Sequence, residues 1–189
     1  MSEEANQPAR DKLLGYGPQG LALEVNPWQT KKSVEAVLLY RGAIVAGWAN
    51  VEATLIEVAI RLSYLPEYHV IRESYPYRRK SRVNFLRAAF DVPGPLLPYA
   101  KIANCILNKF EETADLRSLM AHGGMTILST VKLRVYKSKS SDEVTMMNRV
   151  LTETEMLNLA RNVTRFSRAV RHLYHKLDQI AQLPPLDPQ

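Results

Sequence analysis

The stretch that decides the fold runs from Met156 to Ile180, MLNLARNVTRFSRAVRHLYHKLDQI. Its apolar residues recur at spacings of three and four, so they share one face of a helix. This face consists of Met156, Leu159, Val163, Phe166, Val170, Leu173, Leu177 and Ile180. Just before it, Thr152 and Glu155 have the spacing of a capping box, in which each side chain binds the other residue's backbone N–H group. The pattern predicts a long final helix that begins after Thr152.

A second stripe of the same kind begins at about Thr30. It consists of Val37, Arg41, Ile44, Trp48, Val51, Leu55, Val58 and Leu62, and only Arg41 interrupts its apolar character. Pro66 lacks a backbone donor and disfavours helical angles at Leu65. We therefore predict a long first helix that ends near Leu65.

Shorter elements lie between these two helices. Apolar spacing predicts a helix over 78–90, and DVPGPLLP (91–98) predicts a turn. A third helix is expected from about Pro98 to the glycines Gly123 and Gly124, which can adopt the left-handed angles found just past a helix. Apolar and polar residues alternate over 131–136, and after a Ser/Lys/Asp-rich turn a further strand is expected over 144–150, so this segment predicts a β-hairpin.

Together the patterns predict a mainly α protein, an up-and-down helical bundle with a β-hairpin inserted before the last helix. The chain has 189 residues, of which 46% are hydrophobic and 23% charged, as expected of one globular domain. Residues 1–29 hold several glycines and prolines with little periodicity, so we expect a flexible N-terminal arm. The bundle is expected over 30–182 and a short C-terminal tail over 183–189.

Several features indicate a cytoplasmic protein. Cys105 is the single cysteine, so neither a disulfide framework nor a cysteine-based zinc site can form. The N-terminal residues MSEEANQPARDK contain no apolar run of signal-peptide length. The apolar segment AIVAGWANVEATLIEVAI (43–60) contains Glu52 and Glu57, which are costly in hydrocarbon. We expect this segment to be a buried helix and expect no contact with a membrane.

The charge of the chain is positive and unevenly distributed. Its 25 Lys and Arg residues exceed its 19 Asp and Glu residues, giving a net charge of +6. One basic tract covers Arg72–Arg87 with the single acid Glu73, and another covers Arg161–Lys176 with no acid. Basic tracts suit phosphate groups, although such runs are also common on solvated helix faces. The residues expected to contact phosphate are Arg79, Arg82, Arg165 and Arg168.

An arginine and a histidine stand out at the end of the third helix, in DLRSLMAHGG (115–124). Arg117 falls on the inward stripe, where an unpaired guanidinium group is costly. It therefore needs a carboxylate such as Glu52, an open cleft or a subunit interface. His122 follows five residues later, about 140° around a regular helix. The glycines that follow would let the last turn loosen and the imidazole swing round.

The segment RSLMAH (117–122) resembles the motif of the HEPN superfamily of prokaryotic α-helical domains, an arginine followed after four to six residues by a histidine. The tryptophan and glutamate of GWANVEATL (47–55) in the first helix and the final helix after a hairpin agree with this resemblance. It implies a dimeric helical bundle with the motifs of both subunits in one cleft, which cuts RNA without a metal in active members. Ser118 stands where the family usually has a polar residue such as asparagine.

The resemblance implies roles for individual residues. Arg117 would stabilise negative charge on the scissile phosphate, and His122 would move a proton between the ribose 2′-hydroxyl, water and the leaving group. Ser118 and Glu52 would support them. These roles suit the side chains, because histidine titrates near neutral pH and arginine offers a planar, permanently charged fork.

The first long helix also predicts a homodimer. It carries apolar residues on more than one face, among them Ala43, Ile44, Val45, Trp48 and Ile56. A single bundle core needs one stripe, so the remaining apolar surface indicates contact with a second copy.

Two functions remain open from the sequence. The first is a metal-independent endoribonuclease of toxin or phage-defence type that acts as a homodimer on RNA. The second is a non-catalytic HEPN-like interaction or regulatory module that binds a partner or antitoxin protein, with Arg117 paired to a glutamate and His122 capping its helix. We expect no cofactor, because no nucleotide-binding motif is present, and no metal, because His172 and His175 lack a carboxylate at ligand spacing.

Overall fold

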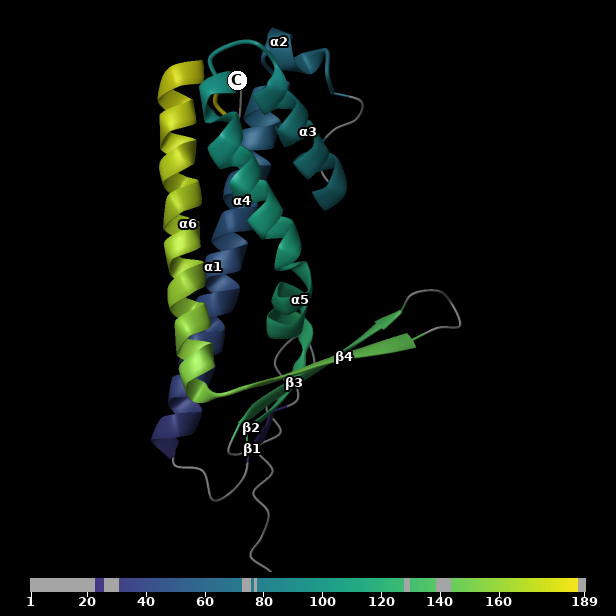
Figure 1. Cartoon of the computed structure of the whole chain (residues 1–189), viewed down its shortest axis with the longest axis vertical. Helices are drawn as coiled ribbons and strands as arrows, with labels where there is room; N and C mark the ends of the chain where they lie inside the picture. Colours follow the sequence, from purple (N-terminus) through teal and green to yellow (C-terminus); the bar gives the residue numbers. More distant parts are fainter. Residues whose placement is uncertain are drawn as a thin grey trace, which may run out of the picture. The chain divides into compact units, whose positions relative to one another are not determined.

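The computed structural model describes residues 23–25, 31–72, 76, 78–127, 130–138 and 144–186. It confirms the predicted mainly α fold (Figure 1). The helices are α1 (Lys31–Ser63), α2 (Pro66–His69), α3 (Arg79–Asp91), the 3₁₀ turn η1 (Leu97–Tyr99), α4 (Ala100–Glu112), α5 (Ala114–His122) and α6 (Glu153–Ala181). The strands are β1 (Leu23–Val25), β2 (Gly124–Ile127), β3 (Val131–Ser138) and β4 (Val144–Leu151).

The chain divides into two compact units. One consists of Met1–Gly42 and Ser118–Asn158, and the other of Ala43–Arg117 and Leu159–Gln189. The first unit contains the sheet and the second contains α2, α3 and α4. The boundaries fall inside α1, α5 and α6, so each of these helices contributes residues to both units.

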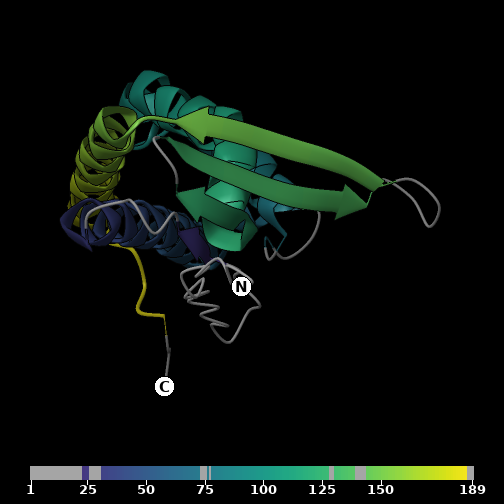
Figure 2. The same cartoon turned by 90° about the horizontal axis from the view of Figure 1, so that it is seen from below.

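The sheet of the first unit has the strand order β1-β2-β3-β4. The predicted hairpin is confirmed, because β3 and β4 pair antiparallel from Val131 opposite Leu151 to Ser138 opposite Val144 (Figure 2). Two further strands were not predicted: β2 pairs antiparallel with β3, and β1 pairs parallel with β2. Strand β1 lies within the expected flexible arm, whose other residues, 1–22 and 26–29, are outside the described part of the chain.

The apolar stripes predicted from the sequence form the core of the second unit. Figure 1 shows α3, α4 and α6 beside α1. On α6, the buried residues Val163, Val170, Leu173 and Leu177 lie on one face, and the ring of Phe166 lies 5.5 Å from that of Trp48. Burial of this apolar surface is the main favourable term in forming the bundle. The capping box at the start of α6 is also confirmed, because Glu155 N donates to Thr152 Oγ1 and Thr152 N to Glu155 Oε2.

The predicted third helix is in fact two helices, α4 and α5, separated at Thr113. The Thr113 hydroxyl donates to the Lys109 carbonyl at 2.7 Å, and its backbone has φ −93° and ψ 8°. A threonine that binds the carbonyl four residues earlier bends a helix because it competes with the regular backbone bond. The backbone of α5 then begins its own ladder, with Arg117 N donating to Thr113 O.

Helix α5 ends at the predicted glycines, but for a different reason than expected. Gly94 is the one glycine in the described part of the chain with a positive φ. At Gly123 a Cβ atom would lie 2.4 Å from the Leu119 carbonyl oxygen and 3.0 Å from that of Arg134. Glycine is therefore required here because the backbone passes close to other backbone atoms, and not because of left-handed angles.

A glycine also allows α1 and α6 to pack closely against each other in the second unit. A Cβ atom on Gly47 would lie 2.6 Å from Val163 Cγ1. Valine has one strongly preferred side-chain rotamer in a helix, so Val163 cannot readily move away. Gly42 on the same helix offers a matched control, because a Cβ atom there meets no atom within 4 Å.

We predict that Gly47→Ala destabilises the protein by up to about 2 kcal/mol, because an overpacking cost of about 1–3 kcal/mol outweighs the gain of about 1 kcal/mol in helix propensity. Gly42→Ala should instead stabilise it by about 0.5–1 kcal/mol. In a Val163→Ala background, where the clashing methyl group is gone, Gly47→Ala should become stabilising. Urea denaturation of the four variants measures these differences. Equal effects of the two glycine substitutions would contradict the close approach.

Candidate active site

The carboxylate of Glu52 joins three helices of the second unit. Arg82 Nη2 on α3 donates to Glu52 Oε1 at 3.1 Å, and Arg117 Nη1 on α5 donates to Glu52 Oε2 at 3.0 Å. The side chains of Arg82, Arg117 and Glu52 are 3%, 18% and 36% exposed. Of the alternatives that the sequence left open for Arg117, the structure therefore shows the ion pair with Glu52.

An aromatic ring completes this arrangement. The guanidinium carbon of Arg117 lies 4.8 Å from the centroid of the Phe110 ring, and that of Arg79 lies 5.7 Å from it. Such contacts attract a cation to the face of an aromatic ring. We call Glu52, Arg79, Arg82, Phe110 and Arg117 the arginine cluster. It contains three guanidinium groups and one carboxylate.

The electrostatics of the arginine cluster favour an added negative charge. Burial lowers the pKa of Arg117 and of Arg82, and the carboxylate of Glu52 opposes this shift. The positive charge of Arg79 lowers the pKa of both groups further. Guanidinium groups stay protonated at neutral pH because their usual pKa exceeds 12. An anion that approached the cluster would therefore relieve repulsion that Glu52 only partly offsets.

Arg117 is held in place but keeps free donors. Its Nη1 atom binds Glu52, whereas its Nε and Nη2 atoms donate no hydrogen bond to the described residues. Neither atom is among the buried polar atoms that lack a partner, so neither is completely buried, and the Arg117 side chain as a whole is 18% exposed. The guanidinium group is thus oriented by Glu52 and retains two nitrogen atoms that donate no hydrogen bond to the described residues.

His122 lies at the end of α5 and belongs to the first unit. Its side chain is exposed, and its imidazole makes no hydrogen bond within the described part of the chain. The expectation that His122 caps the helix is wrong. Arg41 fills that role, with Nε donating to the Met120 carbonyl at 2.8 Å and Nη2 to the Gly123 carbonyl at 2.7 Å.

Arg41 has a structural role, as the cap of α5, that the sequence analysis did not predict. It is 8% exposed, and a cation at a helix C-terminus interacts favourably with the helix dipole and the unpaired carbonyls. The sequence did hold one indication of this role, because Arg41 is the single residue that interrupts the apolar stripe of α1. A buried arginine within such a stripe needs acceptors, but the stripe does not say where they lie.

The remaining predicted site residues are distributed as follows. Arg82 was expected to contact phosphate, but its burial and its ion pair with Glu52 leave it no surface for a ligand. Ser118 is half-buried, and its hydroxyl makes no hydrogen bond within the described residues. Arg165 and Arg168 are exposed on α6. Helix α5 stays regular to His122, so the loosened last turn that was expected is not observed.

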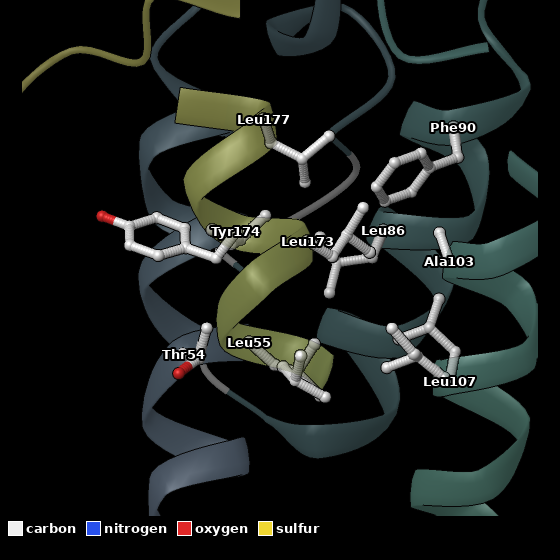
Figure 3. A pocket seen from close by; sticks show the side chains of 12 residues that line it. Thr54, Leu55, Leu86, Phe90, Ala103, Leu107, Leu173, Tyr174 and Leu177 are labelled. Atoms are coloured by element: carbon white, nitrogen blue, oxygen red, sulfur yellow. The ribbon is translucent and has the colours of Figure 1, made fainter. Parts of the chain in front are cut away.

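No metal centre is found in the part of the chain that the structure describes, since no group of three His, Cys, Asp or Glu side chains is placed to hold an ion. An apolar cavity of about 20 Å³ lies between α1, α3, α4 and α6 (Figure 3). Leu86, Leu107 and Leu173 line it, and the hydroxyl of Tyr174 points away from it. Its volume suits about one water molecule, so it is a packing defect of the core and not a substrate pocket.

Comparison with known proteins finds no family model, curated protein or solved structure that matches this chain.

We predict that Glu52→Gln destabilises the protein by about 2–4 kcal/mol, because it leaves the buried Arg82 without the carboxylate that binds it. The control is Glu112→Gln, which removes an exposed ion pair with Lys109 and should cost less than about 1 kcal/mol. Thermal and urea unfolding of both variants measure the difference. Equal losses of stability would show that the Glu52 ion pairs contribute no more than a surface pair.

Proposed function

We propose that this chain is a HEPN-like, metal-independent endoribonuclease of toxin or phage-defence type that acts as a homodimer on RNA. The observation that supports this most strongly is the state of Arg117. Glu52 and Phe110 orient its guanidinium group, yet two of its nitrogen atoms donate no hydrogen bond to the described residues, and the side chain is 18% exposed. An arginine that is positioned before the substrate binds can stabilise charge on a phosphate without reorganisation.

The proposed reaction uses the two motif residues. The imidazole of His122 accepts the proton of the ribose 2′-hydroxyl, and the resulting oxygen attacks the adjacent phosphorus atom. Arg117 binds a non-bridging phosphate oxygen as negative charge develops on it. The bond to the 5′ oxygen then breaks, and that oxygen takes up a proton from water or imidazolium. The products are a 2′,3′-cyclic phosphate and a free 5′-hydroxyl.

The exposure of His122 fits this role. A general base must reach the proton it removes, and an imidazole already occupied by helix carbonyls could not do so. Because Arg41 binds those carbonyls, the imidazole stays available.

We also propose a homodimer, but fewer residues support it in the structure than in the sequence analysis. Ile44 and Trp48 are buried within the chain and leave no surface for a partner. Leu38 and Leu39 on α1 are 40% and 70% exposed. Exposed apolar side chains of this size favour contact with a second copy.

The second candidate is a non-catalytic interaction or regulatory module that binds a partner or antitoxin protein. The specific observation in its favour is the ion pair of Arg117 with Glu52 inside one chain, at 3.0 Å. In this function Arg117 would hold α5 against α1 and would contact no substrate.

We propose that either function is exercised in the cytoplasm, without a membrane. Within the described residues, Ser33–Ser63 is long and apolar enough to span a bilayer by length and composition. The ion pairs of Glu52 and the buried apolar stripe support a role for this helix in the bundle core instead.

We predict that His122→Ala and Arg117→Ala each reduce RNA cleavage by at least about a hundredfold, the usual contribution of one positioned acid–base or charge-stabilising group. EDTA should leave the wild-type rate unchanged. His69→Ala, which removes another exposed histidine, is the control and should cleave normally. A labelled RNA assay on a gel measures all four proteins.

The same variants separate the two candidates. If Arg117 is structural only, wild-type protein should show no cleavage. If it is catalytic, wild-type protein should cleave RNA, and Arg117→Ala should lose that cleavage while staying folded, because Glu52 keeps Arg82 as a partner in the variant.

We predict a dimer in solution, with twice the 21.5 kDa mass of one chain. Leu39→Glu should convert it to a monomer, because a carboxylate is costly in an apolar interface. Val70→Glu places the same charge at another exposed apolar residue, on a different segment, and should leave the mass unchanged. Light scattering measures the mass. A wild-type mass of one chain at every concentration would contradict the proposal.

A further inference from the structure

The second basic tract of the sequence places exposed cations along α6. Its cations are Arg161, Arg165, Arg168, Arg171 and Lys176, all of them exposed. We call these five residues the α6 basic stripe. No aspartate or glutamate occurs between Leu159 and Leu177, and none of the five forms an ion pair or hydrogen bond with the described residues.

Helix geometry arranges this stripe along one side of α6. Arg161, Arg165 and Arg168 follow one another at spacings of four and three, so they lie within one narrow sector of the helix. Arg171 and Lys176 flank that sector. Buried Val163 and Val170 lie on the opposite side. From residue 161 to 176 the stripe extends about 22 Å at 1.5 Å per residue.

The first basic tract, on α3, differs from this stripe. Arg82 is buried against Glu52, and Arg87 forms an ion pair with Glu111 at 2.7 Å. Arg82 and Arg87, which belong to a tract considered for phosphate binding, are therefore paired with carboxylates of the same chain. The α6 basic stripe keeps its charges exposed to solvent.

Repulsion between the cations of the α6 basic stripe destabilises α6. Like charges three and four residues apart on a helix repel each other. Arg161 with Arg165, and Arg165 with Arg168, are such pairs. A bound polyanion would remove this repulsion and release counterions from both surfaces.

We infer that the α6 basic stripe docks the phosphate backbone of a nucleic acid strand without regard to base sequence or sugar. The inference rests on the proposed function in naming RNA as the polyanion that reaches the protein, but it does not depend on cleavage. Arginine forks match phosphate oxygens closely. The exposed His172 and His175 fall in the same sector of α6 by helix spacing, but the five stripe residues are all cations suited to phosphate, so we expect α6 to supply affinity and not sequence selectivity.

Other occupants fit less well. A second copy would bring five like charges against five. A membrane surface is disfavoured because Ile180 is the one exposed large apolar side chain on α6, and it lies beyond the C-terminal end of the stripe. Binding at a bilayer surface normally combines cations with apolar side chains that enter the interface.

The test uses full-length protein with His122→Ala, so that RNA stays intact during binding. Fluorescence anisotropy measures affinity for labelled oligouridylate and oligothymidylate of about 12 nucleotides over a range of salt. With four or five phosphate contacts, the slope of log affinity against log salt should be about −3. Arg161→Ala with Arg165→Ala should reduce that slope by about 1.4 and weaken binding about 50-fold at about 50 mM salt.

The control is a charge-matched pair, Lys101→Ala with Lys109→Ala, which removes two exposed cations from α4 and should change affinity less than about twofold. RNA and DNA should bind within about threefold of each other. Equal weakening by the control pair, a strong preference for one sequence or sugar, or tighter binding to phosphatidylserine vesicles or polyglutamate would each overturn the inference. Binding as expected by a wild-type protein that cleaves no RNA would overturn the ribonuclease proposal alone.

Discussion

The pairing of one carboxylate with two guanidinium groups is the constraint on which the second unit depends. Arg82 is buried, and a buried charge without a partner costs several kcal/mol. Glu52 offsets that cost by binding Arg82 with one oxygen and Arg117 with the other. Because these residues belong to α1, α3 and α5, a single side chain determines how three elements meet. The apolar stripes supply most of the stabilisation, but they alone would tolerate several alignments of the helices.

The arginines of this chain differ in burial and in binding partners, and so in the roles they can have. Arg41 is buried and binds the carbonyls at the end of α5. Arg117 binds Glu52 through Nη1, and its side chain is 18% exposed. The arginines of α6 are exposed. The proposed function uses this gradation: exposed cations would attract a polyanion, and the positioned Arg117 would act on one phosphate.

Local periodicity predicted α1, α3, α6 and the hairpin, because their apolar residues repeat at 3.6 or 2 residues and clear turn residues bound them. The break at Thr113 was not predicted, because the apolar pattern continues unbroken through it. The break depends on a single hydrogen bond, from the Thr113 hydroxyl to the Lys109 carbonyl. Strands β1 and β2 are too short for a pattern, and their pairing joins segments about a hundred residues apart. The stripe of the third helix placed Arg117 inward and so required a partner, whereas the tract around Arg82 gave no indication of which cation faces the core.

The chemistry of the cleaved ends tests the central claim most directly, that Arg117 and His122 act on a ribose phosphate. Wild-type protein should be incubated in EDTA with an RNA and with the same RNA carrying a single 2′-deoxyribose at the cleavage position, and the products analysed by mass spectrometry. The account predicts a 2′,3′-cyclic phosphate from the RNA and no cleavage at the substituted position, because the attacking oxygen is missing. Cleavage at the deoxyribose position, or no cleavage of either substrate, would contradict it.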